Sequence, residues 1–338
     1  MQLRQRSAVV AAILVMMALS AGAQKQPEAM SGYDRSARAT ILHEATVYVA
    51  ADAESQHISL VTPGHEVVVL QHSGPWVKVF ANTDVADQQD PDSEPEFSDA
   101  DNVTPASGWI RDKGVVSPQT PGGDQILFGA AANFEAQAEQ PHAPKGAAVT
   151  AHLLYRRVAE YFPQSPLAGE AAWRSADVRW QLDRQDVMTL PSAKEQDASL
   201  RQQIYEGDMR KIIRQFPGTS YAALAAYDLL DNKLCGDWQG LPHCPELETT
   251  LYEKYAQQYP DGPRAAQALY NAAYRQAVLV TMYTVDDNRK KADAAAAHVQ
   301  QLVQQMQARY PKSEFTARAA SIGFQVQQQI PVYGSDRD

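Results

Sequence analysis

Two cysteines and a neighbouring histidine are the residues of this sequence best suited to chemistry. They belong to the loop "CGDWQGLPHC", in which His243 stands directly before Cys244 and Cys235 begins the stretch. Such a loop is open to three chemistries: a disulfide, a zinc site, or a reactive cysteine–histidine pair. Zinc prefers four tetrahedral ligands and the loop offers three. In an oxidising compartment, two cysteines this close most simply form a disulfide, which we predict for Cys235 and Cys244.

That disulfide would close a short loop and present Trp238 at the edge of whatever element carries it. The loop-closure entropy removed from the unfolded chain is worth roughly 2.5 to 3 kcal/mol. Elsewhere the sequence contains no Gly-rich phosphate loop ending in Lys-Ser/Thr, no Gly-x-Ser-x-Gly and no His-Glu-x-x-His. We therefore predict no catalytic residue, no metal site and no cofactor.

The start of the chain predicts export. Arg4 and Arg6 precede an apolar run from Ala8 to Leu19, and small residues follow up to Ala23. This pattern is typical of a secretory signal peptide over residues 1–23, followed by a linker over 24–36. A membrane anchor is the alternative, but the run is about half of the roughly 20 residues that a spanning helix needs. No cysteine follows it to carry a lipid, and we expect no later transmembrane span. A periplasmic or secreted protein is the expectation.

The charge balance bears on the kind of partner. The chain carries 30 basic and 40 acidic residues, a net charge of −10, and it has no basic tract. Nucleic-acid binders usually show a basic patch or stripe. We therefore expect no nucleic-acid partner.

Residues 37–118 show a β pattern. Short alternating or β-branched runs at 44–50, 65–71 and 75–81 are separated by turn residues, which predicts a small barrel or sandwich. An acidic segment over 82–106 interrupts it, with eight carboxylates and no Lys or Arg between Asp84 and Asp101. Self-repulsion favours a solvated loop. A calcium site is the alternative, but the glycine and final glutamate of a regular calcium loop are missing.

Three features follow one another in this β region: the Gly64 turn before a β-branched strand, the "GPWVKV" stretch from Gly74, and the "GWI" stretch containing Trp109. In these features the region resembles a bacterial SH3 (SH3b) domain. The resemblance implies that aromatic side chains such as Trp76 and Trp109 contact peptidoglycan or proline-rich peptides. The alternative, which the strand pattern favours, is that both rings fill the small core.

Residues 119–330 change to a helical pattern in which one phrase recurs. In each copy a proline ends one helix directly after an aromatic residue, and small residues at helical spacing let the next helix pack closely. Ser165, Ser220 and Ser313 are the predicted N-caps. We expect four helix pairs and a terminal helix, with a flexible tail over 331–338. The four copies are "EYFPQSPLAGEAAW", "RQFPGTSYAALAAY", "QQYPDGPRAAQALY" and "ARYPKSEFTARAAS".

The prolines of these copies are 54, 43 and 51 residues apart, longer than the 34 residues of a strict tetratricopeptide unit. Two stretches between helices account for part of the excess, 184–198 and the cysteine loop. The phrase nevertheless resembles the tetratricopeptide repeats of bacterial outer-membrane assembly lipoproteins and Tol-Pal coordinator proteins. That resemblance implies an α-solenoid with a protein-binding groove.

The leading hypothesis is a non-enzymatic exported scaffold that binds protein partners of the cell envelope. A peptidoglycan-binding wall protein is the second, and a wall hydrolase using Cys244 or the carboxylates of the helical region is the third. The exposed polar positions of the small-faced helices are the groove candidates, because a repeat solenoid offers an extended surface for binding. They are Arg174, Arg264, Gln267, Asn271 and Arg275.

Overall fold

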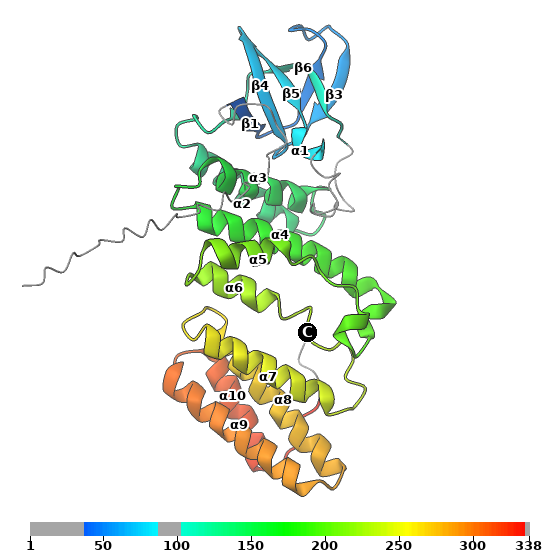
Figure 1. The fold of residues 1–338 in the computed structure, drawn as a ribbon, viewed down its shortest axis with the longest axis vertical. Coiled ribbons are helices and arrows are strands. Elements are labelled where there is room, and N and C mark those ends of the chain that lie inside the picture. The colour runs from blue at the N-terminus through cyan, green and yellow to red at the C-terminus, as the bar shows by residue number, and fades with distance from the viewer. Residues whose placement is uncertain (1–36, 87–102, 335–338) are drawn as a thin grey trace, which may run out of the picture. The chain divides into compact units, whose positions relative to one another are not determined.

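The computed structural model describes residues 37–86 and 103–334. These residues form a small antiparallel β half-barrel followed by a nine-helix, repeat-like α region (Figure 1). The predicted fold class, a small β domain followed by a helical repeat domain, is confirmed. The predicted signal peptide, linker, middle of the acidic segment and last four tail residues lie outside the described residues.

The half-barrel is one seven-stranded sheet in which each pair of neighbours is antiparallel, in the order β3-β2-β6-β5-β4-β1-β7. Alternate side chains point inward, and Val47, Val77, Val79 and Ile110 are fully buried in its core. The strands expected from the β pattern are therefore present. Their bounds are β1 Arg38–Ile41, β2 Ala45–Tyr48, β3 His57–Val61, β4 Glu66–Ser73, β5 Trp76–Ala81, β6 Ala106–Arg111 and β7 Val115–Val116.

The ends of the acidic segment correct one prediction. We expected a solvated loop over 82–106, but Asn82 is fully buried. Its side-chain amide donates to the carbonyls of Leu60 (2.9 Å) and Thr104 (3.0 Å), which joins the two ends of the segment. The short helix α1 (Thr83–Ala86) follows, and Asp84 within it forms ion pairs. Composition misled the prediction here because these groups are hydrogen-bonded within the fold.

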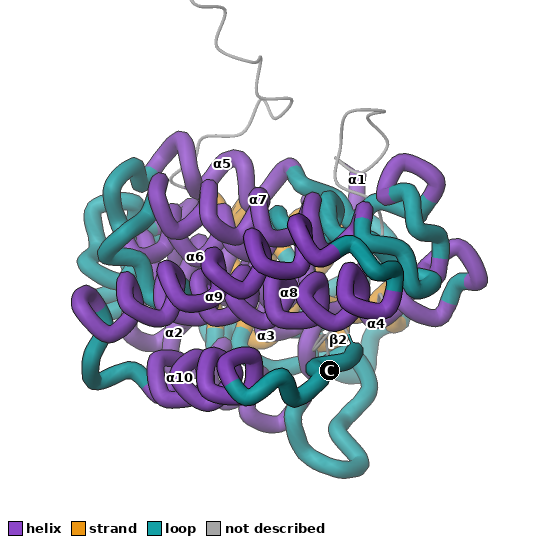
Figure 2. Tube along the Cα trace, turned by 90° about the horizontal axis from the view of Figure 1, so that it is seen from below, coloured by secondary structure: helices purple, strands orange, loops and turns teal. Residues whose placement is uncertain are grey.

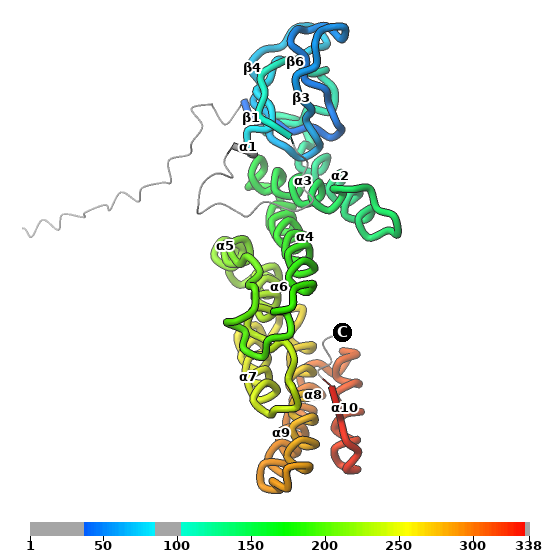
Figure 3. The backbone as a smooth tube through the Cα atoms, turned by 90° about the vertical axis from the view of Figure 1, so that its right-hand side faces the viewer, coloured from blue at the N-terminus to red at the C-terminus, as the bar shows by residue number. Residues whose placement is uncertain are grey.

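The nine longer helices follow one another along the chain and pack against their sequence neighbours (Figures 2 and 3). The last helix, α10, contacts both α8 and α9. The helices are α2 Gly123–Ala138, α3 Ala147–Tyr161, α4 Ala168–Thr189, α5 Gly207–Gln215, α6 Ser220–Asp228, α7 His243–Gln258, α8 Ala265–Val285, α9 Arg289–Arg309 and α10 Glu314–Gln327. Two 3₁₀ turns, η3 Pro191–Lys194 and η4 Ala198–Leu200, lie between α4 and α5.

The recurring phrase has one backbone geometry. Phe162, Phe216, Tyr259 and Tyr310 end α3, α5, α7 and α9 with φ between −126° and −123° and ψ between 49° and 60°. Each donates its N–H to the carbonyl four residues back, and each carbonyl accepts an N–H from the residue three positions on. The proline between them has no N–H and cannot continue the helix. The sequence repeat is thus a repeat in structure, and we call these four sites the aromatic–proline joints.

The predicted N-caps fare differently. Ser313 caps α10, and its hydroxyl oxygen accepts the Phe315 N–H. Ser220 is wrong as a cap, because Thr219 caps α6 by accepting the Ala222 N–H. The Ser165 oxygen accepts from the Leu167 N–H and its hydroxyl donates to Asp124, but α4 begins only at Ala168.

The tail prediction also needs correction, because residues 331–334 are not frayed. Val332 is buried, and its N–H donates to the Thr281 hydroxyl oxygen at 3.0 Å. The Tyr274 hydroxyl donates to the Tyr333 carbonyl. These bonds attach the tail to α8. Among the described residues, no helix is long and apolar enough to cross a bilayer.

Helix α3 attaches the half-barrel to the helices. The Gly64 turn, at φ +90°, lies so close to Leu153 of α3 that a Cβ on Gly64 would be 2.6 Å from the Leu153 Cβ. The Arg157 side chain, 3% exposed, donates to Asp84 (2.7 Å), Glu160 (2.6 Å) and the Gly64 carbonyl (3.0 Å). The interface therefore depends on a buried guanidinium.

The carboxylates around Arg157 show strong electrostatic coupling. Burial alone would raise the pKa of Asp84. The Arg157 charge, together with hydrogen bonds from His65 and the Glu66 N–H, outweighs it and holds that pKa well below its ordinary value. Burial likewise opposes ionisation of Glu160, but Arg157 and Arg156 lower its pKa to about 2. Both groups are therefore ionised in the folded protein at neutral pH.

Candidate partner-binding groove

A groove crosses the side of the helical region where the second helix of each repeat lies. Its volume is about 270 Å³, and α4, α6, α8 and α10 each contribute side chains to it. Both aromatic and polar side chains line it, as suits recognition of a polypeptide. The lining residues are Gln181, Arg184, Tyr227, Leu230, Asp231, Leu234, Tyr252, Gln267, Tyr270, Asn271, Phe315 and Arg318.

Hydrogen bonds and ring contacts fix the middle of the groove. The Asn271 side-chain amide donates to the Tyr227 hydroxyl at 3.0 Å, and Arg264 donates to the Gln267 side-chain oxygen at 2.8 Å. The Arg264 guanidinium also lies over the Tyr227 ring, 5.8 Å from its centroid. These contacts hold Gln267 and Tyr227 in place before any partner binds, which reduces the ordering cost of association.

The guanidinium groups at the two ends of the groove have different partners. Arg184 of α4 forms an ion pair with Asp231 at 3.1 Å. Arg318 of α10 is exposed and lies over the Phe315 ring at 5.4 Å. The groove therefore offers a neutralised pair at one end and a cation–π pair at the other.

Two carboxyl groups beside the groove, those of Asp228 and Asp177, have raised pKa values. Burial raises the pKa of Asp228 to about 8, and the negative charges of Asp177 and Asp231 add to the effect, against Arg264 and Arg184. Burial raises the pKa of Asp177 as well. Asp228 consequently holds its proton in part at neutral pH, which keeps the charge beside the groove lower than composition implies.

The sequence candidates separate into two groups. Gln267 and Asn271 line the groove, and Arg264 contacts Gln267 at its edge. Arg174 of α4 does not line the groove but forms ion pairs with Glu135 of α2 at 2.8 Å and with Glu170 of its own helix at 3.0 Å. Its guanidinium is committed to these carboxylates.

Arg275 and Trp238 were expected to be exposed, and this was wrong. Arg275 is fully buried on α8, and Trp238 is 6% exposed. Both contact Glu248 of α7, which is itself fully buried: Arg275 Nε at 3.0 Å and Trp238 Nε1 at 3.1 Å. Asn271, although it lines the groove, is only 8% exposed. A buried ion pair needs such partners because an isolated charge there is costly.

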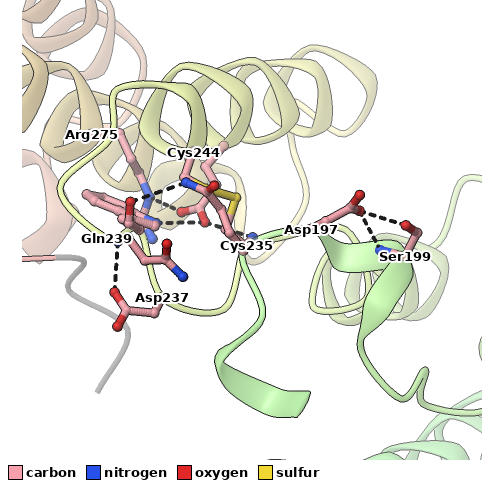
Figure 4. The surroundings of a disulfide bond; sticks show 10 residues. Asp197, Ser199, Cys235, Asp237, Gln239, Cys244 and Arg275 are labelled. Carbon is pink, nitrogen blue, oxygen red and sulfur yellow. Dashed lines mark hydrogen bonds and ion pairs between the residues drawn. A yellow bond between two sulfur atoms is a disulfide. The ribbon is translucent and has the colours of Figure 1, made fainter.

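The predicted disulfide is present. Cys235 and Cys244 are joined, with Cα atoms 5.9 Å apart (Figure 4). Glu248 also accepts the Cys235 N–H at 3.1 Å, so the same carboxylate holds the loop and Arg275. Neither sulfur is a free thiol, which removes the zinc and cysteine-nucleophile alternatives in this state. A disulfide indicates an oxidising compartment.

Trp76 and Trp109 do not fill the core of the half-barrel. Along β5, Val77 and Val79 point into the core, so Trp76 lies on the opposite face. There Tyr48 contacts it edge-on at 5.5 Å and the Arg111 guanidinium covers it at 3.9 Å, leaving 6% exposed. Trp109, partly exposed, pairs with Tyr48 across β2 and β6. We call Tyr48, Trp76 and Trp109 the outer aromatic face.

Several groove residues were missed by the sequence argument. Tyr227 and Tyr270 end two copies of the recurring phrase at the same position, so that position was a usable signal. No comparable sequence pattern marks Arg184, Asp231 and Arg318, because only the packing of the helices brings them to the same groove.

Comparisons with known proteins give limited similarity. No protein-family model matches the chain, and no curated protein matches it. Among solved structures, it is similar to the de novo designed helical repeat protein DHR64, with 16% identity and a TM-score of 0.23, over 61% of this chain and 94% of that one. It is also similar to the DHF79 filament, with 15% identity and a TM-score of 0.23, over 61% of this chain and 96% of that one.

Proposed function

We propose that this chain is a non-enzymatic scaffold of an exported compartment that binds protein partners along its groove. The observation that carries the proposal is that α4, α6, α8 and α10, the second helix of each repeat, all contribute side chains to one groove. Repeat proteins use such extended surfaces for binding. Gln267, held by Arg264, supplies a hydrogen-bonding group, and Tyr227, held by Asn271, supplies a ring.

In this proposal the helical region is a tetratricopeptide-like solenoid, and the half-barrel is an SH3b domain. The four joints of equal geometry support the first assignment. The second is supported by the strand positions and by the Gly64 turn. The disulfide and the signal-like start of the chain support a periplasmic or secreted location.

Site-specific photo-crosslinking in the native compartment tests the groove. A photoreactive residue replaces Gln267, which lines the groove, and in a matched variant it replaces Lys254, which is exposed on α7. We expect discrete protein adducts at position 267 and none of the same masses at 254. Adducts of equal pattern at both positions, or none at 267, would contradict the groove as the binding site.

A second candidate function is peptidoglycan binding by the outer aromatic face. The observation that favours it is the partly exposed Trp109 beside Tyr48, flanked by Lys78 and Arg111. Aromatic rings that face solvent on one side commonly mark contact surfaces. This would tether the scaffold to the wall.

Co-sedimentation with purified peptidoglycan tests this candidate and should use the intact chain. Without α3, the carboxylates of Asp84 and Glu66 would lose Arg157, so an isolated half-barrel is a poor control. We expect wild type to pellet and Trp109→Ala to pellet less, with exposed Phe324→Ala unchanged. If wild type stays in solution, the outer aromatic face has another role.

A further inference from the structure

The two insertions that lengthen the repeats meet in space. Residues 190–206 follow α4, and the disulfide loop precedes α7. The N–H groups of Gly236 and Asp237 donate to the carbonyls of Glu195 (3.0 Å) and Lys194 (3.1 Å). A Cβ on Gly236 would be 2.4 Å from the Ala193 carbonyl oxygen, so this approach requires glycine. Backbone hydrogen bonds therefore hold the two insertions against each other.

Together with α8 and the tail, these insertions enclose a cavity of about 730 Å³. The tail wall is held by the bonds from Val332 and Tyr333 to α8 described above. Such a volume is typical of ligand sites. In repeat proteins, insertions often gather on the binding face. The cavity is thus built from the parts of the chain that depart from the repeat.

The cavity wall is mostly apolar, and the apolar surface continues outside it. Trp238, Val278 and Met282 line the interior. Three other lining residues are largely exposed: Val285 at 79%, Tyr333 at 70% and Met188 at 54%. Exposed apolar surface that continues from a cavity marks an interaction site larger than a small molecule needs. Methionine side chains also adapt to partners of varied shape.

The charges at the cavity nearly balance. Lys194 and Asp237 lie on segments paired by a backbone hydrogen bond, and Asp286 stands at the end of α8. The Asp237 carboxylate already accepts the Gln239 N–H at 2.9 Å (Figure 4). Although the whole chain carries −10, the lining holds one basic and two acidic side chains, too small a difference to complement a strongly charged ligand.

We propose that this cavity binds an uncharged, apolar stretch of a partner polypeptide, at a site separate from the groove. Apolar side chains of the partner enter between Trp238 and Met282, and its flanking residues cover Val285 and Tyr333. The binding energy comes from apolar area removed from water. A scaffold with this site holds one partner in the groove and an unstructured apolar segment here.

Fluorescence anisotropy tests the proposal with the intact, oxidised protein. The probe is a labelled peptide of about ten leucine, valine and serine residues, acetylated and amidated so that it is uncharged. Val285→Glu is the main variant, because its side chain is 79% exposed and the change leaves the core intact. Phe324→Glu on α10, at 60% exposure, is the matched control away from the cavity. Met282→Trp fills the cavity.

We expect wild type and Phe324→Glu to bind the peptide equally, and Val285→Glu to bind at least about tenfold more weakly, because it places a carboxylate in an apolar contact. Equal binding by Val285→Glu would overturn the proposal. Binding of dodecyl maltoside but not the peptide, lost in Val285→Glu, would assign an acyl-chain site instead. Self-association lost in the same variant, without peptide binding, would assign a second copy. Gln267 variants leave this site intact, so the two proposals fail separately.

Discussion

Replacing Arg157 by methionine should be one of the most damaging single changes in this protein. Three acceptors lie within 3.0 Å of its guanidinium, on Asp84, Glu160 and the Gly64 carbonyl, and its side chain is 3% exposed. Methionine keeps much of the stem but leaves the carboxylates without their cation. Removing one partner of a buried pair costs about 3 to 5 kcal/mol, a large fraction of a typical stability of about 5 to 15 kcal/mol.

Urea unfolding of the intact chain, followed by tryptophan fluorescence and circular dichroism, measures this cost. Arg156→Met is the matched control, because that neighbouring side chain is 42% exposed and its pair with Glu160 lies at the surface. It should cost no more than about 1 kcal/mol. Arg157→Lys should fall between, since a lysine keeps the charge but not the fork of donors. If the two methionine variants differ by less than about 1 kcal/mol, the junction does not depend on the buried guanidinium.

Three further predictions concern pH and the disulfide. Stability should fall as the pH drops from about 4.5 to about 2, and the fall should be smaller in Arg157→Met. The reason is that Glu160 and Asp84 have lowered pKa values, so the folded state binds fewer protons than the unfolded state there. Asp228→Asn should be more stable than wild type at pH 9, because a pKa raised from 3.8 to about 8 means that wild type loses stability as the pH rises between these values, and the loss is complete at pH 9. Reducing Cys235–Cys244, or replacing both by serine, should lower the free energy of unfolding by about 2.5 kcal/mol, measured with and without reductant.

The helical architecture could be predicted because the residues that end each helix are neighbours in the sequence. An aromatic residue followed by proline and a turn ends a helix wherever it occurs, and each of the four joints lies where it was expected. The disulfide was likewise accessible, because two cysteines on one short loop have few other partners. The positions of β2, β4 and β5 followed from runs of alternating or β-branched residues between turn residues, whereas no such run was identified for β1, β3 or β7.

Side-chain roles were harder to predict because they depend on contacts between distant residues. Arg275 of α8 is a charged residue, and its type predicts an exposed position. It is nevertheless fully buried, and its guanidinium forms an ion pair with Glu248 of α7. Trp76 was expected to fill the core of the half-barrel, but it is buried on the outside of the sheet, where Arg111 and Tyr48 cover it. Only the register between strands β5 and β6 places Arg111 opposite Trp76. That register was not visible in the sequence.

The aromatic–proline joints also bear on how such a chain grows. Each joint is closed by its own backbone bonds: the aromatic residue donates its N–H to the carbonyl four residues back, and its carbonyl accepts the N–H of the residue three positions on. A duplicated repeat would therefore contain the residues that end its own helix, and a deletion would remove them together with that helix. In both cases the ends of the neighbouring helices would not change. In this chain the extra material, residues 190–206 and the disulfide loop, stands between α4 and α5 and between α6 and α7, while all four joints are intact. Because each joint depends only on its own residues, an insertion between helices can change in length or sequence without altering the joints.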